Sequence, residues 1–284
     1  MKIKNILALF IVGLVLFSCK KDDDNSEDYD AAGQSIIDDN ALIDYLKTHY
    51  LNEEDGGIWT ITDGESSLMD DPRLGVQDVN YNDVDYKLYF LTKNEGSTIS
   101  PSAVDSIYAT YTGMLLDSTV FDSKTTFSWN IGSSPAILSS LIPGWQYGFT
   151  NFKGGTVVQN TDESFDFEDY GEGILFIPSG LAYRNTSSGL VEKNAPLIFE
   201  IALKSVNLID HDLDGVDSKF EDLNGDNNFT NDDTDEDGIY NYLDDDDDGD
   251  GVLTKDEDAN GDGDPTNDDT DGDGTPDYLD KDTN

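Results

Sequence analysis

Acidic side chains in the last quarter of the sequence follow a spacing that suits a metal ion. They stand at positions one, three, five and twelve of twelve-residue segments, with a glycine at position six. Ca²⁺ takes about six to eight oxygen ligands, and alternate carboxylates on a tightly turning loop converge on one point. The glycine allows the sharp turn, and the acid at position twelve closes the ligand shell. The spacing therefore predicts calcium binding.

Four segments carry this pattern, and we call them loops A (residues 210–221), B (233–244), C (246–257) and D (269–280). Four copies in register are more specific than one, although a disordered acidic spacer without metal is the alternative. The expected ligands are Asp210, Asp212, Asp214 and Glu221 in loop A, Asp233, Asp235, Asp237 and Asp244 in loop B, Asp246, Asp248, Asp250 and Glu257 in loop C, and Asp269, Asp271, Asp273 and Asp280 in loop D. Two looser loops add Asp222, Asn224, Asp226, Asp258, Asn260 and Asp262.

The loops belong to an internal repeat with a period of 36 residues. Asp258 in the second copy corresponds to Asp222 in the first, and Tyr278 corresponds to Tyr242. A period of this length is typical of arrays. The loops overlap end to end and leave no room for the flanking helices of an EF-hand. The array therefore resembles thrombospondin type 3 repeats without their disulfides. Because it has few apolar residues and crowded carboxylates, we expect residues 208–284 to fold only with Ca²⁺ bound.

The single cysteine, Cys19, stands where a lipid anchor would be attached. Lys2 and Lys4 precede an apolar run at residues 6–17, which is shorter than the roughly 20 residues of a membrane span. Residues 16–19 resemble the lipobox of bacterial lipoproteins, in which this thiol is acylated before cleavage. The alternative is an ordinary signal peptide with an incidental cysteine. We expect a signal peptide at residues 1–18, a lipid on Cys19 and a bacterial outer-membrane location.

Residues 19–33 are polar and charged and predict a flexible tether. Their Lys-Lys-Asp-Asp-Asp stretch also resembles the surface-export signals of Bacteroidetes lipoproteins. The formal net charge of −45 disfavours nucleic acid as a partner, because phosphate would be repelled. From Asp210 to the end there are 30 acidic and 3 basic residues, so a domain boundary falls near residue 208.

The elements that precede this boundary have the composition of a globular domain. Asp39 or Asn40 can cap a short helix with Leu42, Leu46 and Tyr50 on one face. Alternating apolar segments at 86–91, 106–112, 126–131, 173–177 and 196–203 predict antiparallel strands, with a helix near 144–152. We therefore expect an N-terminal helix and extended segment at 34–82, an α+β domain at 83–207, and an acidic tail at 208–284 with a core separate from the domain's.

Five short motifs stand in the order seen in FKBP-type peptidyl-prolyl cis–trans isomerases, and the resemblance spans about residues 83 to 206. It implies a twisted antiparallel sheet wrapped around a short helix, and isomerisation of X–Pro bonds in unfolded or Pro-containing protein clients without a cofactor. The motifs are YTGML at 111–115, FDS at 121–123, LIPGW at 141–145, FIP at 176–178 with LAY at 181–183, and APLIFE at 195–200.

The resemblance also implies the residues of a proline-binding cleft. Trp145 would form its floor, Tyr183 would donate a hydrogen bond to the substrate carbonyl, and Leu190 and Val191 would form its lip. For several of the aromatic residues, simple core packing is the alternative. The implied catalytic residues are Tyr111, Phe121, Asp122, Trp145, Tyr183 and Phe199, and the implied substrate-binding residues are Phe127, Trp129, Leu141, Ile142, Leu190 and Val191.

Some positions depart from the family pattern. Arg184 replaces the glycine that usually follows the cleft tyrosine, and residues 154–170 form an insertion that predicts a hairpin. These changes leave two alternatives to an enzyme. The chain could be a non-catalytic member that holds peptides in the same cleft, or a structural surface protein whose calcium array is its function.

Overall fold

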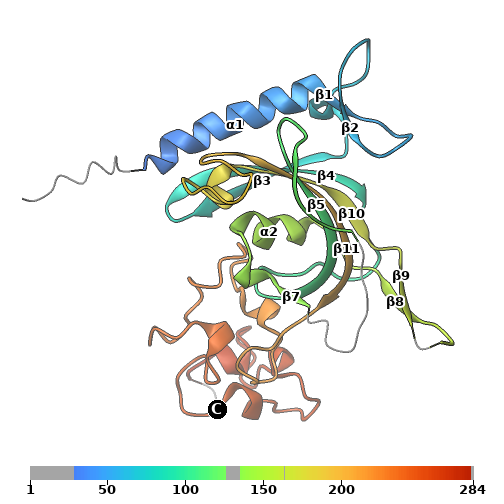
Figure 1. The fold of residues 1–284 in the computed structure, drawn as a ribbon. Coiled ribbons are helices and arrows are strands. Elements are labelled where there is room, and N and C mark those ends of the chain that lie inside the picture. Colours follow the sequence, from blue (N-terminus) through green and yellow to red (C-terminus); the bar gives the residue numbers. More distant parts are fainter. Residues whose placement is uncertain (1–28, 126–134, 163, 283–284) are drawn as a thin grey trace, which may run out of the picture.

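The computed structural model describes residues 29–125, 135–162 and 164–282. Its main feature is an antiparallel sheet of seven strands in the order β3-β4-β10-β11-β5-β6, with β7 beside β5 (Figure 1). The sheet curves around the short helix α2 (Pro143–Gly148), so the expected α+β fold is confirmed. The strands are β3 (Leu74–Tyr81), β4 (Val84–Asn94), β5 (Ser106–Leu115), β6 (Val120–Lys124), β7 (Ala136–Ile137), β10 (Gly171–Ile177) and β11 (Leu197–Asn207).

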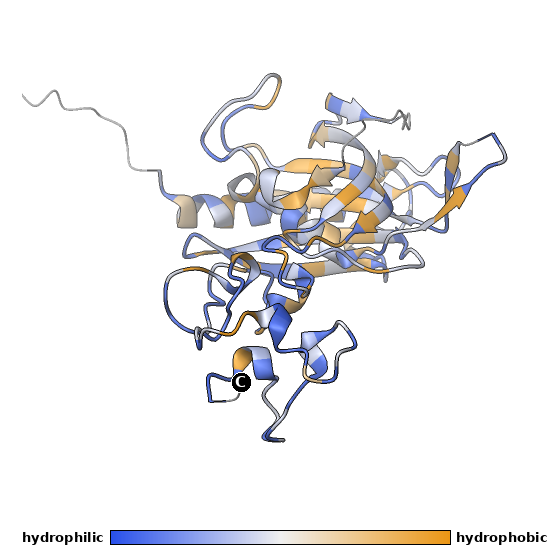
Figure 2. Ribbon diagram, turned by 90° about the horizontal axis from the view of Figure 1, so that it is seen from below, coloured by the Kyte–Doolittle hydropathy of each residue, from blue (hydrophilic) through white to orange (hydrophobic). Residues whose placement is uncertain are grey.

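Apolar side chains alternate along the strands and supply a core on each face of the sheet. In β10, Leu175 and Ile177 belong to the core around α2, whereas Ile174 and Phe176 belong to the core on the opposite face. Successive strand residues point to opposite faces, so two buried faces produce this near-continuous apolar run. In Figure 2 the sheet is accordingly rich in apolar residues.

The helix α1 (Ala31–Thr48) covers the face opposite α2, as Figure 1 shows. It begins well before Asp39, because the side chain of Asp30 caps it by accepting a hydrogen bond from the Gly33 N–H at 2.8 Å. The predicted start at Asp39 or Asn40 is therefore wrong. The exposed side chains of Ile36 and Ile37 interrupt the apolar stripe and hide the first turns in the sequence pattern.

The buried carboxylate of Asp38 links α1 by hydrogen bonds to the segment that follows β10. Its Oδ2 accepts hydrogen bonds from the N–H and the hydroxyl of Ser179, at 2.7 and 2.6 Å. Its Oδ1 accepts one from Gln34 at 2.7 Å. Burial raises the pKa of Asp38 above its usual value. Leu42 and Leu46 complete the contact by packing into the core on this face.

The remaining short elements surround this sheet. Residue Tyr50 lies in β1 rather than in the helix, and the sheet begins at Leu74, before residue 83, which we expected to be the start of the domain. The expected hairpin in the insertion is present as a separate two-stranded sheet. These elements are β1 (His49–Leu51), β2 (Ile58–Thr60), β8 (Thr156–Gln159), β9 (Phe165–Glu168), and the 3₁₀ turns η1 (Leu68–Asp70), η2 (Leu138–Ser140), η3 (Phe149–Asn151) and η4 (Ser179–Leu181).

The acidic tail folds as turns and short 3₁₀ segments below α2 and β7 in Figure 1. These are η5 (Ser218–Glu221), η6 (Asn241–Leu243), η7 (Thr254–Asp256), η8 (Pro265–Asn267) and η9 (Asp277–Leu279). We had expected the tail to have a core separate from that of the sheet domain, and this prediction is wrong. Phe229 and Tyr242 pack against Ala103 and Val104, and Lys219 donates a hydrogen bond to the Ser100 carbonyl at 2.6 Å.

Four predictions concern residues outside the described part of the chain. These are the signal peptide with its lipidation site at Cys19, the tether as far as residue 28, the strand at 126–131, and the cleft residues Phe127 and Trp129. The predicted end of the tether at residue 33 is wrong, because α1 begins at Ala31. Within the described ranges, no helix combines the length and the apolar character that a membrane crossing requires.

Candidate functional sites

Four aromatic residues that the family resemblance assigns to the cleft lie together on the concave side of the sheet. The ring centroid of Trp145, from α2, is 4.8 Å from that of Tyr111 and 5.2 Å from that of Phe199. Phe121 lies 5.6 Å from Phe199. All three pairs are edge-to-face, a favourable arrangement for aromatic rings. A wall of this kind can receive an uncharged prolyl ring.

Close backbone approach positions these rings. The helix α2 begins with Pro143, whose fixed φ suits a first helical position. A side chain at Gly144 would collide with Ile177, so the glycine lets α2 lie directly on β10. A side chain at Gly113 would likewise collide with Phe121 and Phe199. Glycines at these two positions therefore allow the aromatic cluster to close.

A polar pair stands beside the rings. The Tyr111 hydroxyl donates a hydrogen bond to Asp122 Oδ2 at 2.8 Å, between the paired strands β5 and β6. Burial, with Asp122 as the second cause, raises the pKa of Tyr111 to about 12. The hydroxyl therefore stays protonated and keeps Asp122 in a fixed direction at neutral pH.

Tyr183 follows η4 and is half-buried against the same core. The next residue, Arg184, has a φ of 56°, in the left-handed region that favours glycine. This conformation explains why a glycine is usual at that position. The guanidinium of Arg184 lies over the Tyr29 ring, 5.6 Å from its centroid.

The other described residues that the resemblance assigns to the cleft differ in their burial. Leu141 and Ile142 pack partly buried against the core, and Val191 is buried. Leu190, which the resemblance assigns to the lip, is 61 % exposed. The structure thus brings Tyr111, Phe121, Trp145 and Phe199 together, and Leu141, Ile142, Tyr183 and Val191 pack in or against the same core.

The tail brings its carboxylates together as the spacing predicts. One oxygen from each of the residues at positions one, three and five lies within 4.8 Å of the other two in every loop from A to D. Two oxygens bound to one Ca²⁺ at about 2.4 Å are at most about 4.8 Å apart. The glycines at position six have φ values between 95° and 103°, which other residues rarely adopt. The four are Gly215, Gly238, Gly251 and Gly274.

Several of these carboxylates are buried with oxygens that have no hydrogen-bond partner among the described residues. Neither carboxylate oxygen of Asp212, Glu221 or Glu257 has such a partner. Burial, reinforced by neighbouring carboxylates, raises the pKa of Glu221 to about 10, and those of Asp212 and Glu257 to about 8. A buried anion without a partner is costly, and a divalent cation would remove that cost. The donor set, all oxygen, fits Ca²⁺.

The residue at position nine of each loop has a role that we did not predict. Its side chain accepts a hydrogen bond from the N–H of position two, and its N–H bonds to the carbonyl of the residue before the loop. A small or short polar residue at this position in all four loops was the available signal. These residues, all buried, are Ser218, Asn241, Thr254 and Asp277.

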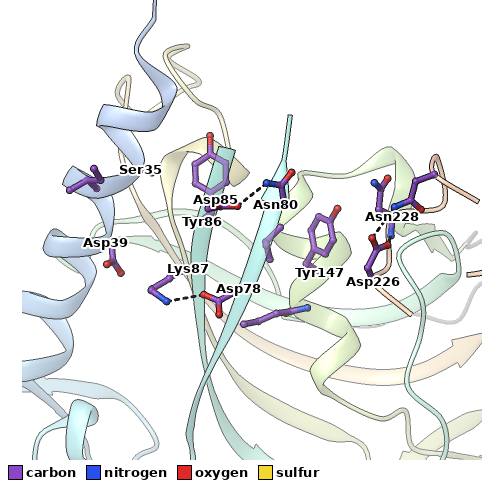
Figure 3. A pocket seen from close by; sticks show the side chains of 14 residues that line it. Ser35, Asp39, Asp78, Asn80, Asp85, Tyr86, Lys87, Tyr147, Asp226 and Asn228 are labelled. Atoms are coloured by element: carbon purple, nitrogen blue, oxygen red, sulfur yellow. Dashed lines mark hydrogen bonds and ion pairs between the residues drawn. The ribbon is translucent and has the colours of Figure 1, made fainter. Parts of the chain in front are cut away.

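A hollow of about 900 Å³ lies between α1, the β3–β4 hairpin, Tyr147 of α2 and the tail, and no residue of the aromatic cluster lines it (Figure 3). Its lining is mainly polar and charged. It includes Asp39, Asp226 and the ion pair between Lys87 and Asp78, at 2.8 Å. Such a lining does not suit a prolyl ring, so we place the candidate cleft at the aromatic cluster.

Comparison with known proteins agrees with this geometry. Residues 97–204 match the family described as FKBP-type peptidyl-prolyl cis-trans isomerase. Residues 211–264 match a second family, described as BamM C-terminal. The sheet domain and the acidic tail are therefore recognised separately.

Curated relatives match less than half of this chain. The probable FKBP-type peptidyl-prolyl cis-trans isomerase FkpA of Neisseria meningitidis is 34 % identical over 119 residues, which are 42 % of this chain and 37 % of the relative. The outer membrane protein MIP of Legionella longbeachae is 32 % identical over 114 residues, 39 % of this chain and 40 % of the relative. The chain thus spans less than half the length of these relatives.

Among solved structures, FkpA from Escherichia coli is 27 % identical, with a TM-score of 0.33, over 42 % of this chain and 48 % of that one. A peptidyl-prolyl cis-trans isomerase from Pseudomonas syringae is 24 % identical, with a TM-score of 0.35, over 49 % of this chain and 84 % of that one.

Proposed function

We propose that the FKBP-type peptidyl-prolyl cis–trans isomerase domain contained in this chain catalyses rotation about X–Pro bonds of exported proteins. The observation that carries this proposal is the contact of Trp145 with Tyr111 and Phe199. It joins residues from α2, β5 and β11 that the family resemblance assigns to one cleft.

The reaction needs no nucleophile or cofactor. Rotation of the amide faces a barrier of about 18–20 kcal/mol, because resonance across the C–N bond must be broken. A pocket of aromatic rings excludes water and disfavours the planar, well-hydrated amide relative to the twisted one. Tyr183 would donate a hydrogen bond to the substrate carbonyl, while the exposed Leu190 contacts residues that flank the proline.

A protease-coupled isomerase assay on the full-length protein tests this proposal. Trp145→Ala removes the floor of the cleft and should abolish most of the activity. Trp59→Ala is the matched control, since Trp59 lies on β2 and is 52 % exposed. Near-ultraviolet circular dichroism checks that both variants are folded. A folded wild-type protein without activity would contradict catalysis and support the non-catalytic, peptide-holding alternative.

We further propose that the protein is a lipoprotein anchored through Cys19 to the bacterial outer membrane, with its cleft available to exported clients. The lipobox-like residues 16–19 support the anchor. The match of residues 211–264 to the BamM C-terminal family and the similarity to a relative described as an outer membrane protein support an envelope location. The acidic stretch after Cys19 supports exposure at the surface.

The tail, in this proposal, is a calcium-binding module. The convergence of carboxylates in loops A to D and the unpartnered, buried oxygens of Glu221 and Glu257 support it. Extracellular sites of this type bind Ca²⁺ at about 10⁻⁴–10⁻³ M, which suits a permanent structural role. If the isomerase assay fails while calcium binding holds, the structural surface role becomes the better proposal.

A further inference from the structure

One carboxylate in the tail lies in a cluster that its place in the sequence does not suggest. Asp247 belongs to loop C, yet one of its oxygens lies within 4.8 Å of oxygens from Asp214 and Glu221, both of loop A. The side chains of these three residues are almost completely buried, with exposed fractions of 1 %, 0 % and 0 %. Three acidic groups at this separation repel one another strongly when all are charged.

The cluster also has free ligand atoms. Within the described part of the chain, neither oxygen of Glu221 has a hydrogen-bond partner, and the same holds for Asp214 Oδ2 and Asp247 Oδ1. The other oxygen of Asp214 accepts a hydrogen bond from the Val216 N–H at 2.8 Å. Four unpartnered oxygens thus lie on three buried side chains, and a divalent cation would stabilise all of them at once.

Asp247 is exceptional within the repeat. It stands at position two of loop C, where loops A, B and D carry His211, Thr234 and Thr270. Position two supplies no ligand to its own loop, whose first three acids converge without it. The side chain of Asp247 is therefore free to serve another loop.

We propose that Asp247 ligates the cation of loop A, so that one Ca²⁺ joins loop A to its repeat copy, loop C. Asp214 and Glu221, both expected ligands of loop A, bring their oxygens within 4.8 Å of Asp247 and would bind the same ion. The inference rests on the calcium function proposed for the tail and extends it. The ion then closes the tail into a compact unit, in place of a string of independent loops.

Calcium titration calorimetry of the full-length protein tests the proposal. Asp247→Asn keeps the shape and removes the charge, and we expect one site to bind at least about tenfold more weakly. Asp245→Asn is the matched control, because Asp245 carries the same charge in the same run but is exposed. The control should bind like the wild type. Equal binding by Asp247→Asn and the wild type would overturn the cross-loop site alone.

A second measurement separates ligation from a structural role. Without Ca²⁺, Asp247→Asn relieves repulsion in the cluster and should protect the tail from proteolysis. With millimolar Ca²⁺, the same substitution should make the tail more sensitive than the wild type. A residue that acts only through its contact with Thr254 would weaken the tail in both conditions, and that result would overturn the proposal.

Glu221→Gln provides an independent variant of the same site. If Asp247 and Glu221 share one ion, each single variant and the double variant should weaken the same single site. Two separately weakened sites in the double variant would show separate ions and overturn the proposal. A wild-type protein that binds no Ca²⁺ would instead refute the calcium function of the whole tail, and the cross-loop site with it.

Discussion

Among the cleft residues, Tyr183 is the one whose polar group we expect to contact the substrate. It is half-buried, whereas the Tyr111 hydroxyl already donates to Asp122. Arg184 directs its guanidinium toward Tyr29. Arg184, which replaces the usual glycine, therefore places a positive charge beside the residue that precedes the cap of α1.

We expect Tyr183→Phe to lower kcat/KM about two- to thirteenfold, which corresponds to one hydrogen bond of about 0.5–1.5 kcal/mol. The protease-coupled assay measures this effect. Tyr50→Phe, on the distant strand β1, is the matched control and should retain full activity. An unchanged rate for Tyr183→Phe would exclude the hydroxyl from catalysis.

The carboxylates of the tail show which contacts can be predicted from sequence and which cannot. The convergence of the carboxylates at positions one, three and five could be predicted because it depends on local spacing, and the glycines at position six take the expected backbone conformation. Asp247 could not be assigned, because its partners Asp214 and Glu221 come from another loop. In the sequence it is one acid in a run of five.

At the scale of elements, α1 is held to the sheet by a buried polar contact as well as by apolar packing. The strands could be predicted because alternation is a local signal, and the described strands β4, β5, β10 and β11 lie where it indicated. The start of α1 could not be predicted correctly. Asp39 and Asn40 are both residue types that cap helices, and the exposed Ile36 and Ile37 obscure the helical period before them.

Asp38→Ala should lower the free energy of unfolding by about 1–3 kcal/mol, because it leaves the buried N–H of Ser179 without an acceptor. Chemical denaturation of the full-length protein measures this change. Asp44→Ala is the control on the exposed side of α1 and should have little effect. Equal stabilities of the two variants would mean that water replaces the contact.

At the scale of the whole molecule, the tail and the sheet domain share a small core. Phe229 and Tyr242 of the tail meet Ala103 and Val104, which precede β5. The Ile209 N–H also donates to the buried Asp105 carboxylate at 3.0 Å. We therefore expect the state of the tail to influence the stability of the domain.

Chelation of Ca²⁺ should expand the tail, because its carboxylates then repel one another without a counter-charge. Small-angle scattering and limited proteolysis of the full-length protein, in EDTA and in millimolar Ca²⁺, measure this effect. Cleavage in EDTA should concentrate in residues 208–282. Identical scattering and cleavage in both buffers would contradict calcium binding and show that the tail is only an acidic spacer.

Cys19→Ala should convert the membrane-associated protein into a soluble one, because the lipid is its proposed anchor. Fractionation of cells followed by immunoblotting measures the distribution. The same substitution should leave isomerase activity unchanged, since residue 19 precedes the sheet domain. A variant that still sediments with membranes would contradict anchoring through this residue.

The contact between Asp38 and Ser179 joins residues 141 positions apart and so orders the events of folding. In the export that we propose for this chain, α1 would emerge from the membrane long before Ser179 and β10. During that interval Leu42 and Leu46 have no sheet to cover them. Contacts between residues so distant in sequence form slowly. Until they form, the apolar side chains of α1 remain exposed, and exposed apolar surface promotes aggregation. We therefore expect α1 to dock last and to need protection by a holding chaperone during export.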